Sequence, residues 1–274
     1  MNIYAGIVTF NPDEKKLHSN VKAIISQVKT VIIYDNGSKN IKSIEKIARE
    51  NKLILLKGFK NYGIAYALNK LMEYGYKRQY KWMISLDQDS ICPNNYAIVI
   101  SDLIKKISKA GIIAPIIKDR NIGIVGHNPI GEYKDVNTCI TSGACTNLLA
   151  WKSVNGFDEK MFIDSVDFDF CYRVKKAGFR VVQTSQLTLE HSLGDSKVIS
   201  TLFGNKKVSM HSSFRYYYIA QNEIYYPKKN RLFFRFLRGN FRNIIHILNV
   251  VLYESQKSSK IKSILKGWYR GFQL

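Results

Sequence analysis

The residues best suited to chemistry in this sequence are Asp87 and Asp89, in the stretch MISLDQDSICP (83–93). They follow an apolar segment, so they would stand at the end of a buried strand. Residues i and i+2 of an extended segment share a face and lie about 6–7 Å apart at Cα. Two carboxylates at that spacing can hold one Mg²⁺ or Mn²⁺ together with substrate phosphates. The alternative is that one of them only caps the following turn, and the pair alone leaves both interpretations open.

Alternating strand-like and helix-like segments must position these acids. The strands are short and almost continuously apolar, and the helices between them are amphipathic. This rhythm predicts a mainly parallel sheet covered on both faces, an α/β fold with αβα layers. Strands are predicted at 2–10, 30–36, 53–58, 81–87 and 111–117, and helices at 14–28, 41–52, 63–77 and 96–110.

The alternation ends after Lys118. We expect one αβα domain at 1–225 and a basic, helical appendage at 226–274, since from about residue 213 the sequence is aromatic and basic without alternating strands. Within the second half of this domain we predict a loop or short ribbon at 118–137, a strand, turn, strand and short helix at 139–157, a helix at 165–178 and further strands at 179–191.

Composition bounds the class of protein. The 274 residues are 46% hydrophobic and 23% charged, which is typical of a folded globular chain. The N-terminal MNIYAGIVTFNP has no basic region followed by a long apolar one, so it predicts a strand and not a signal peptide. No apolar run approaches the roughly 20 residues that span a bilayer. Without CxxC spacing, we expect reduced thiols in a cytoplasmic protein at Cys92, Cys139, Cys145 and Cys171.

The net charge of +21 implies an anionic partner, and it is concentrated at the C-terminal end. Residues 228–274 contain eleven Lys or Arg and one acid, Glu254. The stretch KKNRLFFRFLRGNFRNIIHILNVVLY (228–253) interleaves basic and apolar residues, which suits a helix on an anionic membrane surface. A helix packed on the catalytic domain with a solvated basic face explains it almost as well.

A non-enzymatic nucleic-acid-binding protein is the alternative from another class. The pI near 9.7 and the basic, aromatic C-terminal segment favour it. The sequence has no RRM-like, KH-like or zinc motif, however, and nucleic-acid binding leaves the acids at the strand ends unexplained.

Polar clusters follow each of the first four predicted strands. They are Thr9–Asn11, Asp35–Ser38, Lys57–Gly63 and Asp87–Ser90. In open α/β sheets, ligands bind at the carboxyl ends of the strands. Each cluster alone also has a structural explanation, since DNGS is good turn chemistry and a glycine often begins a helix. Gly63 lets the backbone approach a ligand, and the N-terminus of the following helix favours an anion.

A second group of acids lies further along the chain. Asp164, Asp167 and Asp169 stand in and before the predicted helix at 165–178. Acids in a first turn complement the helix dipole, which accounts for at least one of them. A carboxylate beside a cleft can also act as general base for a hydroxyl nucleophile. His191 follows a strand and is either structural or a ligand, and Arg215 lies among aromatic residues, where it could clamp phosphate or pack the appendage.

Taken in order, these motifs resemble the inverting family 2 glycosyltransferases, most of all the bacterial rhamnosyltransferases of polysaccharide synthesis. The resemblance covers about residues 1–225 and rests on VTFNP, DNGS, NYGIAYALN, LDQDS (a DXD motif), TSGACTNLLAWKSVNGFDE, FIDSVDFDFCYRVKKAGFRV, EHSLGD and RYYYIAQN. It implies the GT-A fold and transfer of L-rhamnose from dTDP-L-rhamnose to a lipid-linked saccharide. It also implies a peripheral position on the inner face of the plasma membrane. UDP-galactofuranose and UDP-hexoses are alternative donors.

The resemblance also implies a role for each motif residue. The donor would be bound by Thr9, Asn11, Asp35, Asn36, Gly63, Asp87 and Arg215, with Asp35 on the base and Arg215 on the leaving phosphate. The metal, Mg²⁺ or Mn²⁺, would be held by Asp89, Asp87 and His191. Ser142, Gly143 and Ala144 would line the pocket for the donor sugar and acceptor. Asp167 would be the catalytic base, with Asp164 and Asp169 as rivals. Gln221 stands where the pattern has an arginine, which leaves a second phosphate-binding arginine unsupported.

Overall fold

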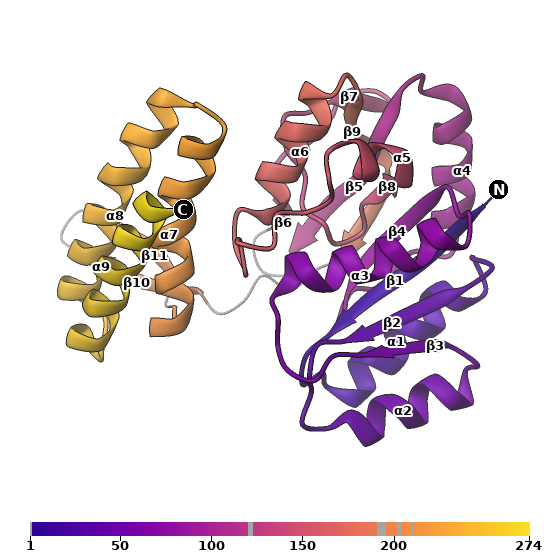
Figure 1. The fold of residues 1–274 in the computed structure, drawn as a ribbon, viewed down its shortest axis with the longest axis horizontal. Helices are drawn as coiled ribbons and strands as arrows, with labels where there is room; N and C mark the ends of the chain where they lie inside the picture. The colour runs from indigo at the N-terminus through magenta and orange to yellow at the C-terminus, as the bar shows by residue number, and fades with distance from the viewer. Residues whose placement is uncertain (1, 120–122, 191–195, 202–203, 210) are drawn as a thin grey trace. The chain divides into compact units, whose positions relative to one another are not determined.

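Short, buried strands and the helices between them fold into two compact units in the computed structural model (Figure 1). The structure describes residues 2–119, 123–190, 196–201, 204–209 and 211–274. The first unit contains Met1–Lys160 and Val166–Ser192, and the second contains Met161–Ser165 and Leu193–Leu274. This division differs from the boundary expected at residue 225, because residue 225 lies inside a helix, α7 (Ser213–Lys229), that belongs entirely to the second unit.

The first unit is built on one sheet whose strand order is β3-β2-β1-β4-β8-β5-β9-β7, with β6 paired to β5. Strands β1 to β4 run parallel to one another, and β5 is parallel to β9. Strand β8 runs antiparallel to both β4 and β5, β6 runs antiparallel to β5, and β7 runs antiparallel to β9. The predicted, mainly parallel α/β sheet is confirmed. The strands are β1 (Ile3–Thr9), β2 (Val31–Asp35), β3 (Ile54–Lys57), β4 (Trp82–Asp87), β5 (Ala110–Asp119), β6 (Gly123–Val125), β7 (Tyr133–Asp135), β8 (Cys145–Asn147) and β9 (Arg180–Glu190).

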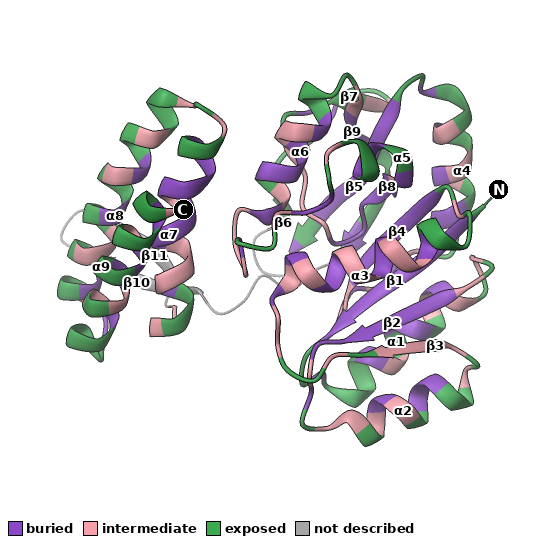
Figure 2. Cartoon of the chain, viewed as in Figure 1, coloured by how far each residue is buried: buried purple, intermediate pink, exposed green. Residues whose placement is uncertain are grey.

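Helices cover both faces of this sheet, which explains why the strands are apolar on both sides (Figure 2). On one face, Leu17 of α1 and Ile100 of α4 share a core with Ile7 of β1. On the other face, the Tyr4 hydroxyl donates to the Leu71 carbonyl of α3 at 2.8 Å. The helices of this unit are α1 (Glu14–Ile25), α2 (Ile41–Glu50), α3 (Ile64–Lys77), α4 (Tyr96–Lys106), α5 (Leu148–Ser153) and α6 (Val166–Lys176).

The strand register aligns the carboxyl ends of the parallel strands. Thr9 pairs with Asp35, Asp35 with Lys57, and Val8 with Asp87. The polar clusters that follow these strands therefore lie along a single edge of the sheet, as predicted. The strand expected at the start of 139–157 does not form, because residues 141–144 make a turn whose backbone bonds to Ser85, and β8 begins only at Cys145.

The described part of the second unit contains the helices α7, α8 (Phe233–Tyr253) and α9 (Lys257–Gln273). It also contains a hairpin that the sequence did not suggest, β10 (Ser196–Thr201) with β11 (Gly204–Ser209). Its core is small: Tyr216, Ala220, Val250 and Ile264. Glycines let the helices approach closely, because a Cβ at Gly239 would lie 2.1 Å from the Glu223 carbonyl oxygen. None of the described helices has the length and apolar character needed to cross a membrane.

Candidate functional site

The turn after β2 is organised around the carboxylate of Asp35, which is 1% exposed. Its Oδ1 accepts hydrogen bonds from the hydroxyls of Thr9, at 3.0 Å, and Ser38. Its Oδ2 accepts from the backbone N–H groups of Gly37, at 3.2 Å, and Ser38, at 2.9 Å. Asp35 therefore holds the turn together, and its contact with a nucleotide base stays a prediction.

Replacing Asp35 tests how far the nucleotide edge depends on this turn. We expect Asp35→Ala to lower the free energy of unfolding by about 2–4 kcal/mol, because two hydroxyls and two backbone N–H groups lose a buried acceptor. Denaturant titration measures the change. The control Asp102→Ala removes only an exposed carboxylate paired with Lys105 and should cost at most about 0.5 kcal/mol. Equal stability of the two variants would contradict the assigned role.

Side-chain amides join the loop after β1 to the turn after β2. Asn11 adopts a left-handed backbone, with φ of 47°. Its N–H donates to the Ser38 hydroxyl at 2.8 Å, and its Oδ1 accepts from the Lys39 N–H at 2.8 Å. The expected nucleotide-bordering loop is thus fixed to the DNGS turn before any ligand binds.

A second amide joins the turn after β2 to the loop after β3. Asn36 donates through Nδ2 to the Asn61 side chain at 2.9 Å and to the Gly63 carbonyl at 3.1 Å, and its Oδ1 accepts from the Tyr62 N–H at 3.0 Å. Gly63, at φ of 91°, immediately precedes α3. The structure therefore brings together the candidates Thr9, Asn11, Asp35, Asn36 and Gly63.

The turn that carries Asp87 and Asp89 is braced from both sides. The Asn20 amide donates to the Asp87 carbonyl at 2.5 Å. The buried Ser142 hydroxyl accepts from the Asp87 N–H at 3.4 Å and lies 2.6 Å from the Ser90 hydroxyl. Both aspartates are half-buried at the end of β4. Ser142 thus contacts the acidic turn, and its expected place in the pocket for the donor sugar and acceptor stays a prediction.

The other two residues of the SGA turn are packed tightly. Gly143 has φ of 75°, and a Cβ there would lie 2.9 Å from both Leu189 and Pro115. Its carbonyl accepts from the Tyr96 hydroxyl, and its N–H donates to the Ser85 carbonyl at 2.7 Å. Only a glycine suits this position, so Gly143 serves the shape of the turn.

The two carboxylates at the end of β4 fit a metal site in which the substrate supplies the remaining ligands. Among the described residues there is no group of three His, Cys, Asp or Glu side chains that could hold an ion by itself. His191, the third expected ligand, lies outside the described residues. Mg²⁺ and Mn²⁺ sites commonly use one or two carboxylates together with substrate phosphates and water, and Asp87 and Asp89 supply that share.

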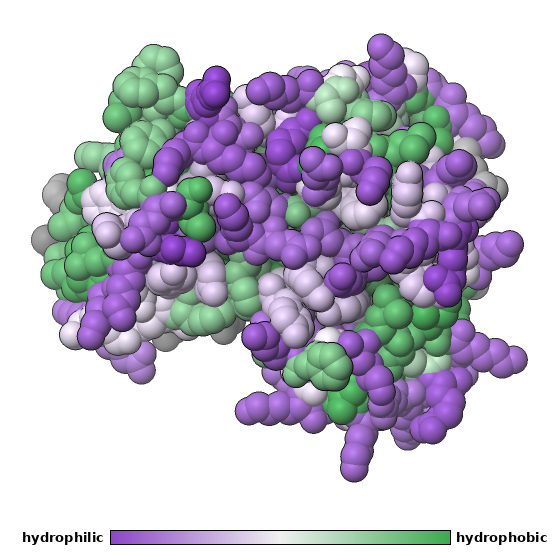
Figure 3. All heavy atoms as spheres, viewed as in Figure 1, coloured by the Kyte–Doolittle hydropathy of each residue, from purple (hydrophilic) through white to green (hydrophobic). Residues whose placement is uncertain are grey.

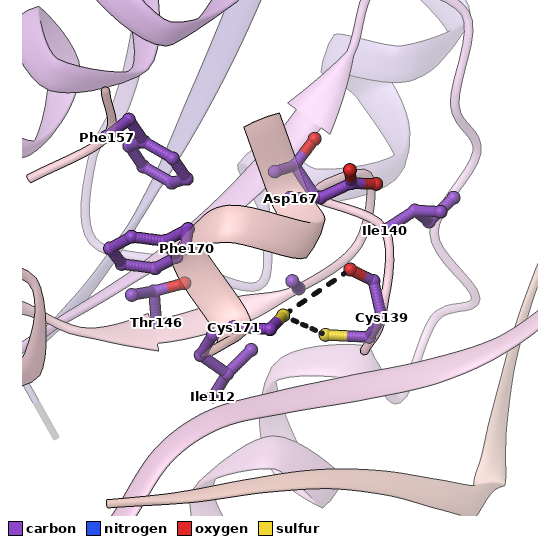
Figure 4. Close-up of a pocket in the computed structure, with 10 residues that line it drawn as sticks. Ile112, Cys139, Ile140, Thr146, Phe157, Asp167, Phe170 and Cys171 are labelled. Carbon is purple, nitrogen blue, oxygen red and sulfur yellow. Dashed lines mark hydrogen bonds between the residues drawn. The ribbon is translucent and has the colours of Figure 1, made fainter. Parts of the chain in front are cut away.

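Asp167 lines a small pocket between α6 and the 139–146 segment, drawn in Figure 4. It stands in the first turn of α6 and is half-buried, and its Oδ1 accepts from the Phe168 N–H at 2.9 Å. A half-buried carboxylate that lines a pocket can act as a general base, and this role of Asp167 stays a prediction. The pocket is lined by Ile112, Cys139, Ile140, Thr141, Ala144, Thr146, Phe157, Asp167, Phe170 and Cys171.

Two cysteine thiols face each other in this pocket (Figure 4), with the Sγ atoms of Cys139 and Cys171 3.7 Å apart. The hydrogen bond with Cys171, and then burial, raise the pKa of the Cys139 thiol well above its usual value. The raised pKa favours the neutral thiol, which is a poor nucleophile.

The rival acid Asp169 has a structural partner. It is fully buried and paired with Arg173, with Oδ2 and Nε 2.7 Å apart. Arg173 also donates to the carbonyls of Val154 and Gly156, at 2.6 and 2.7 Å. The pair therefore fixes α6 to the loop that follows α5.

The other rival, Asp164, belongs to the second unit and is paired there with Arg215. Arg215 donates through Nη2 to Asp164 Oδ1 at 2.9 Å and through Nε to Oδ2 at 3.2 Å. The Asn222 amide donates to the carbonyls of Ile163, at 2.9 Å, and Asp164, at 2.8 Å. Asn222 of the RYYYIAQN motif thus binds the backbone of residues 163–164.

Sequence reasoning missed several residues that build this site. Gln88 accepts the Phe10 N–H at 2.9 Å and so links the loop after β1 to the acidic turn. Its position between the two aspartates was a usable signal. Nothing in the sequence singled out Asn20, a buried polar residue of α1, because its partner lies 67 positions away.

Comparisons with known proteins bear on the fold and the chemistry. No family model matches the sequence. The chain is 28% identical over 283 residues to the dTDP-rhamnosyl transferase RfbF of Shigella flexneri, which covers 95% of this chain and 92% of that one. Its fold is similar to that of mannosyltransferase PcManGT from Pyrobaculum calidifontis, solved with GDP-Man and Mn²⁺ (TM-score 0.59, 10% identity, 97% of this chain and 73% of that one). It is also similar to GalNAc-T7, solved with UDP, GalNAc and Mn²⁺ (TM-score 0.59, 14% identity, 70% of this chain and 44% of that one).

These findings confirm two predictions. The α/β fold with a mainly parallel sheet is a glycosyltransferase fold, shared with solved glycosyltransferases. The chain is a glycosyltransferase that resembles, over nearly its whole length, a bacterial rhamnosyltransferase. Two of the similar structures contain Mn²⁺, which is consistent with a divalent metal.

Proposed function

We propose that this glycosyltransferase moves L-rhamnose from dTDP-L-rhamnose to a hydroxyl of a lipid-linked saccharide, with inversion at the anomeric carbon, in cell-surface polysaccharide synthesis. One observation carries the proposal. Strand register and side-chain hydrogen bonds bring three polar clusters together at the carboxyl edge of the sheet, beside the acidic turn of Asp87 and Asp89. The similarity to a dTDP-rhamnosyl transferase supports the choice of donor.

Different residues at the carboxyl edge of the sheet would bind the nucleotide and the metal. The interlocked loops of Thr9, Asn11, Asp35, Asn36 and Gly63 would receive the nucleotide, which needs little rearrangement because their hydrogen bonds already exist. Asp87 and Asp89, with His191, would hold Mg²⁺ or Mn²⁺. When bound, this ion would neutralise the negative charge of the diphosphate leaving group.

Asp167 would act on the acceptor. In the proposed reaction its carboxylate takes the proton from the acceptor hydroxyl while that oxygen bonds to the anomeric carbon and the bond to the diphosphate breaks. Arg215, which is paired with Asp164, would stabilise the negative charge of the departing phosphate. No covalent sugar–protein intermediate is required.

A donor screen tests this function. We expect Mn²⁺ together with a dTDP nucleotide to raise the melting temperature by several degrees, and radiolabel to pass from dTDP-rhamnose to extracted membrane lipid. UDP-galactofuranose and UDP-hexoses are run in parallel, because the same fold accepts other donors. If the protein prefers a UDP-sugar, dTDP-L-rhamnose is wrong as the donor, but the proposal that the protein transfers a sugar stands. Stabilisation by RNA or DNA alone, without any nucleotide effect, would overturn the transferase proposal.

A further inference from the structure

Helix α8 leaves most of its large apolar side chains exposed (Figure 2). Its buried residues are Gly239, Asn243 and Val250, and Ile247 packs against the small core of the second unit. Phe234 is 83% exposed and Phe241 is 64% exposed. Hydrophobic spheres gather over α8 in Figure 3. We define the α8 face as the exposed residues Phe233, Phe234, Leu237, Phe241, Ile244, Ile245, Leu248, Val251 and Leu252.

Specific contacts fix this orientation. The Asn243 amide donates to the Ala220 carbonyl of α7 at 3.1 Å, and Asn240 accepts from the Trp268 indole of α9 at 2.9 Å. Gly239 lies against the Glu223 backbone, where any side chain would clash. Rotating α8 to bury its apolar side would break these hydrogen bonds and place bulky side chains where Gly239 fits. These contacts therefore keep the α8 face exposed.

The α8 face is continuous along the helix and has a basic border. At about 100° per residue, Phe234, Phe241, Leu248 and their apolar neighbours form a single stripe. Three arginines, Arg235, Arg238 and Arg242, follow one edge of that stripe, and α8 contains no acid. A monomeric soluble protein rarely leaves so long an apolar surface uncovered, so we expect it to have a partner.

Charge identifies the partner as anionic. The acids nearest in sequence are already used: Glu223 pairs with Arg242 and His246, and Glu254 pairs with Lys260. A second copy that docked through the same face would bring arginines against arginines without new carboxylates. An anionic bilayer accepts both features, because aromatic and aliphatic side chains enter the acyl boundary while arginines meet the lipid phosphates.

We propose that the α8 face docks the chain onto an anionic lipid bilayer, with α8 lying in the plane of the interface. Exposed Leu265, Tyr269 and Phe272 on α9 could extend the contact. The inference deepens the proposed function, and rests on it only in that a lipid-linked acceptor gives the docking a purpose. The docking itself depends on neither donor nor acceptor.

Vesicle sedimentation without any nucleotide tests the docking. We expect the protein to bind vesicles of phosphatidylcholine with 30% phosphatidylglycerol, by our choice of composition, and to bind pure phosphatidylcholine at least about tenfold more weakly. The triple variant Phe234→Ser, Phe241→Ser, Leu248→Ser should weaken anionic-vesicle binding at least about tenfold, because it removes three of the inserted side chains. Its melting temperature should not fall, since all three are exposed.

Matched controls and a separate donor assay make the outcome decisive. The variant Ile98→Ser, Ile124→Ser, Ile130→Ser removes three exposed apolar side chains of the first unit and should bind vesicles like the unmodified protein. Arg238→Gln should weaken only the binding to anionic vesicles. The proposal is overturned if the α8 variant binds as before, or if it loses only a self-association seen by sedimentation velocity. The nucleotide thermal shift, measured without lipid, reports separately on the transferase function.

Discussion

Asp89→Asn should lower kcat/KM for sugar transfer by about 10²–10³-fold and remove the effect of Mn²⁺ on nucleotide diphosphate binding. The reason is the small share of metal ligands that the chain supplies. The described residues contain no group of three side chains that could hold the ion, so the loss of one of the two carboxylates after β4, Asp87 and Asp89, would remove a large part of the protein's hold on it. Phosphates and water cannot replace it at equal affinity, since the ion then loses a full opposing charge.

The measurement separates metal binding from folding. Initial rates and the dissociation constant of dTDP are determined at several Mn²⁺ concentrations, for the unmodified protein, for Asp89→Asn and for the control Asp102→Asn on the exposed side of α4. We expect the control to match the unmodified protein. Asn20 and Ser142 brace this turn through the backbone of Asp87, so Asp89→Asn should keep the melting temperature of the unmodified protein. Rates within threefold of the unmodified protein at every Mn²⁺ concentration would remove Asp89 from the site.

Strand ends could be predicted from the sequence because their signal is local. A run of apolar residues that stops at Thr9, Asp35 or Asp87 marks both the strand and the place where polar groups begin. In parallel strands the carboxyl ends share one edge, so the gathering of the clusters followed from the α/β fold alone. The bonds that stiffen the edge could not be predicted in this way. Ser142 and Asp87 are 55 positions apart, and only the folded sheet makes them neighbours.

In the second unit, the sequence predicts a helix but not its orientation. The pattern of α8 predicts an amphipathic helix, but not which side faces the protein, because that depends on Gly239 and Asn243 meeting α7. Hydrophobic periodicity alone would have turned Phe234 and Phe241 inward. In this unit, close backbone approach and amide hydrogen bonds outweigh the burial of apolar side chains.

The three acids near α6 were indistinguishable by spacing, and the structure gives each a different partner. Asp169 holds Arg173, Asp164 holds Arg215, and Asp167 lines the pocket. Asp167→Asn should therefore lower kcat by about 10²–10⁴-fold, the usual contribution of a general base, while the dissociation constant of the donor nucleotide changes less than threefold. An amide has nearly the shape of the carboxylate but cannot accept the hydroxyl proton.

The two rivals supply the matched comparison for Asp167→Asn. Asp169→Asn should lower the free energy of unfolding by about 3 kcal/mol, because Arg173 loses its buried counter-charge, and the folded fraction should keep kcat within about tenfold. Asp164→Asn should weaken its pair with Arg215, which is partly exposed, and cost at most about 1 kcal/mol. A general base differs from both in losing turnover while stability and donor binding persist. If Asp164→Asn shows that pattern and Asp167→Asn does not, the proton is taken by Asp164, and the pocket of Figure 4 is structural.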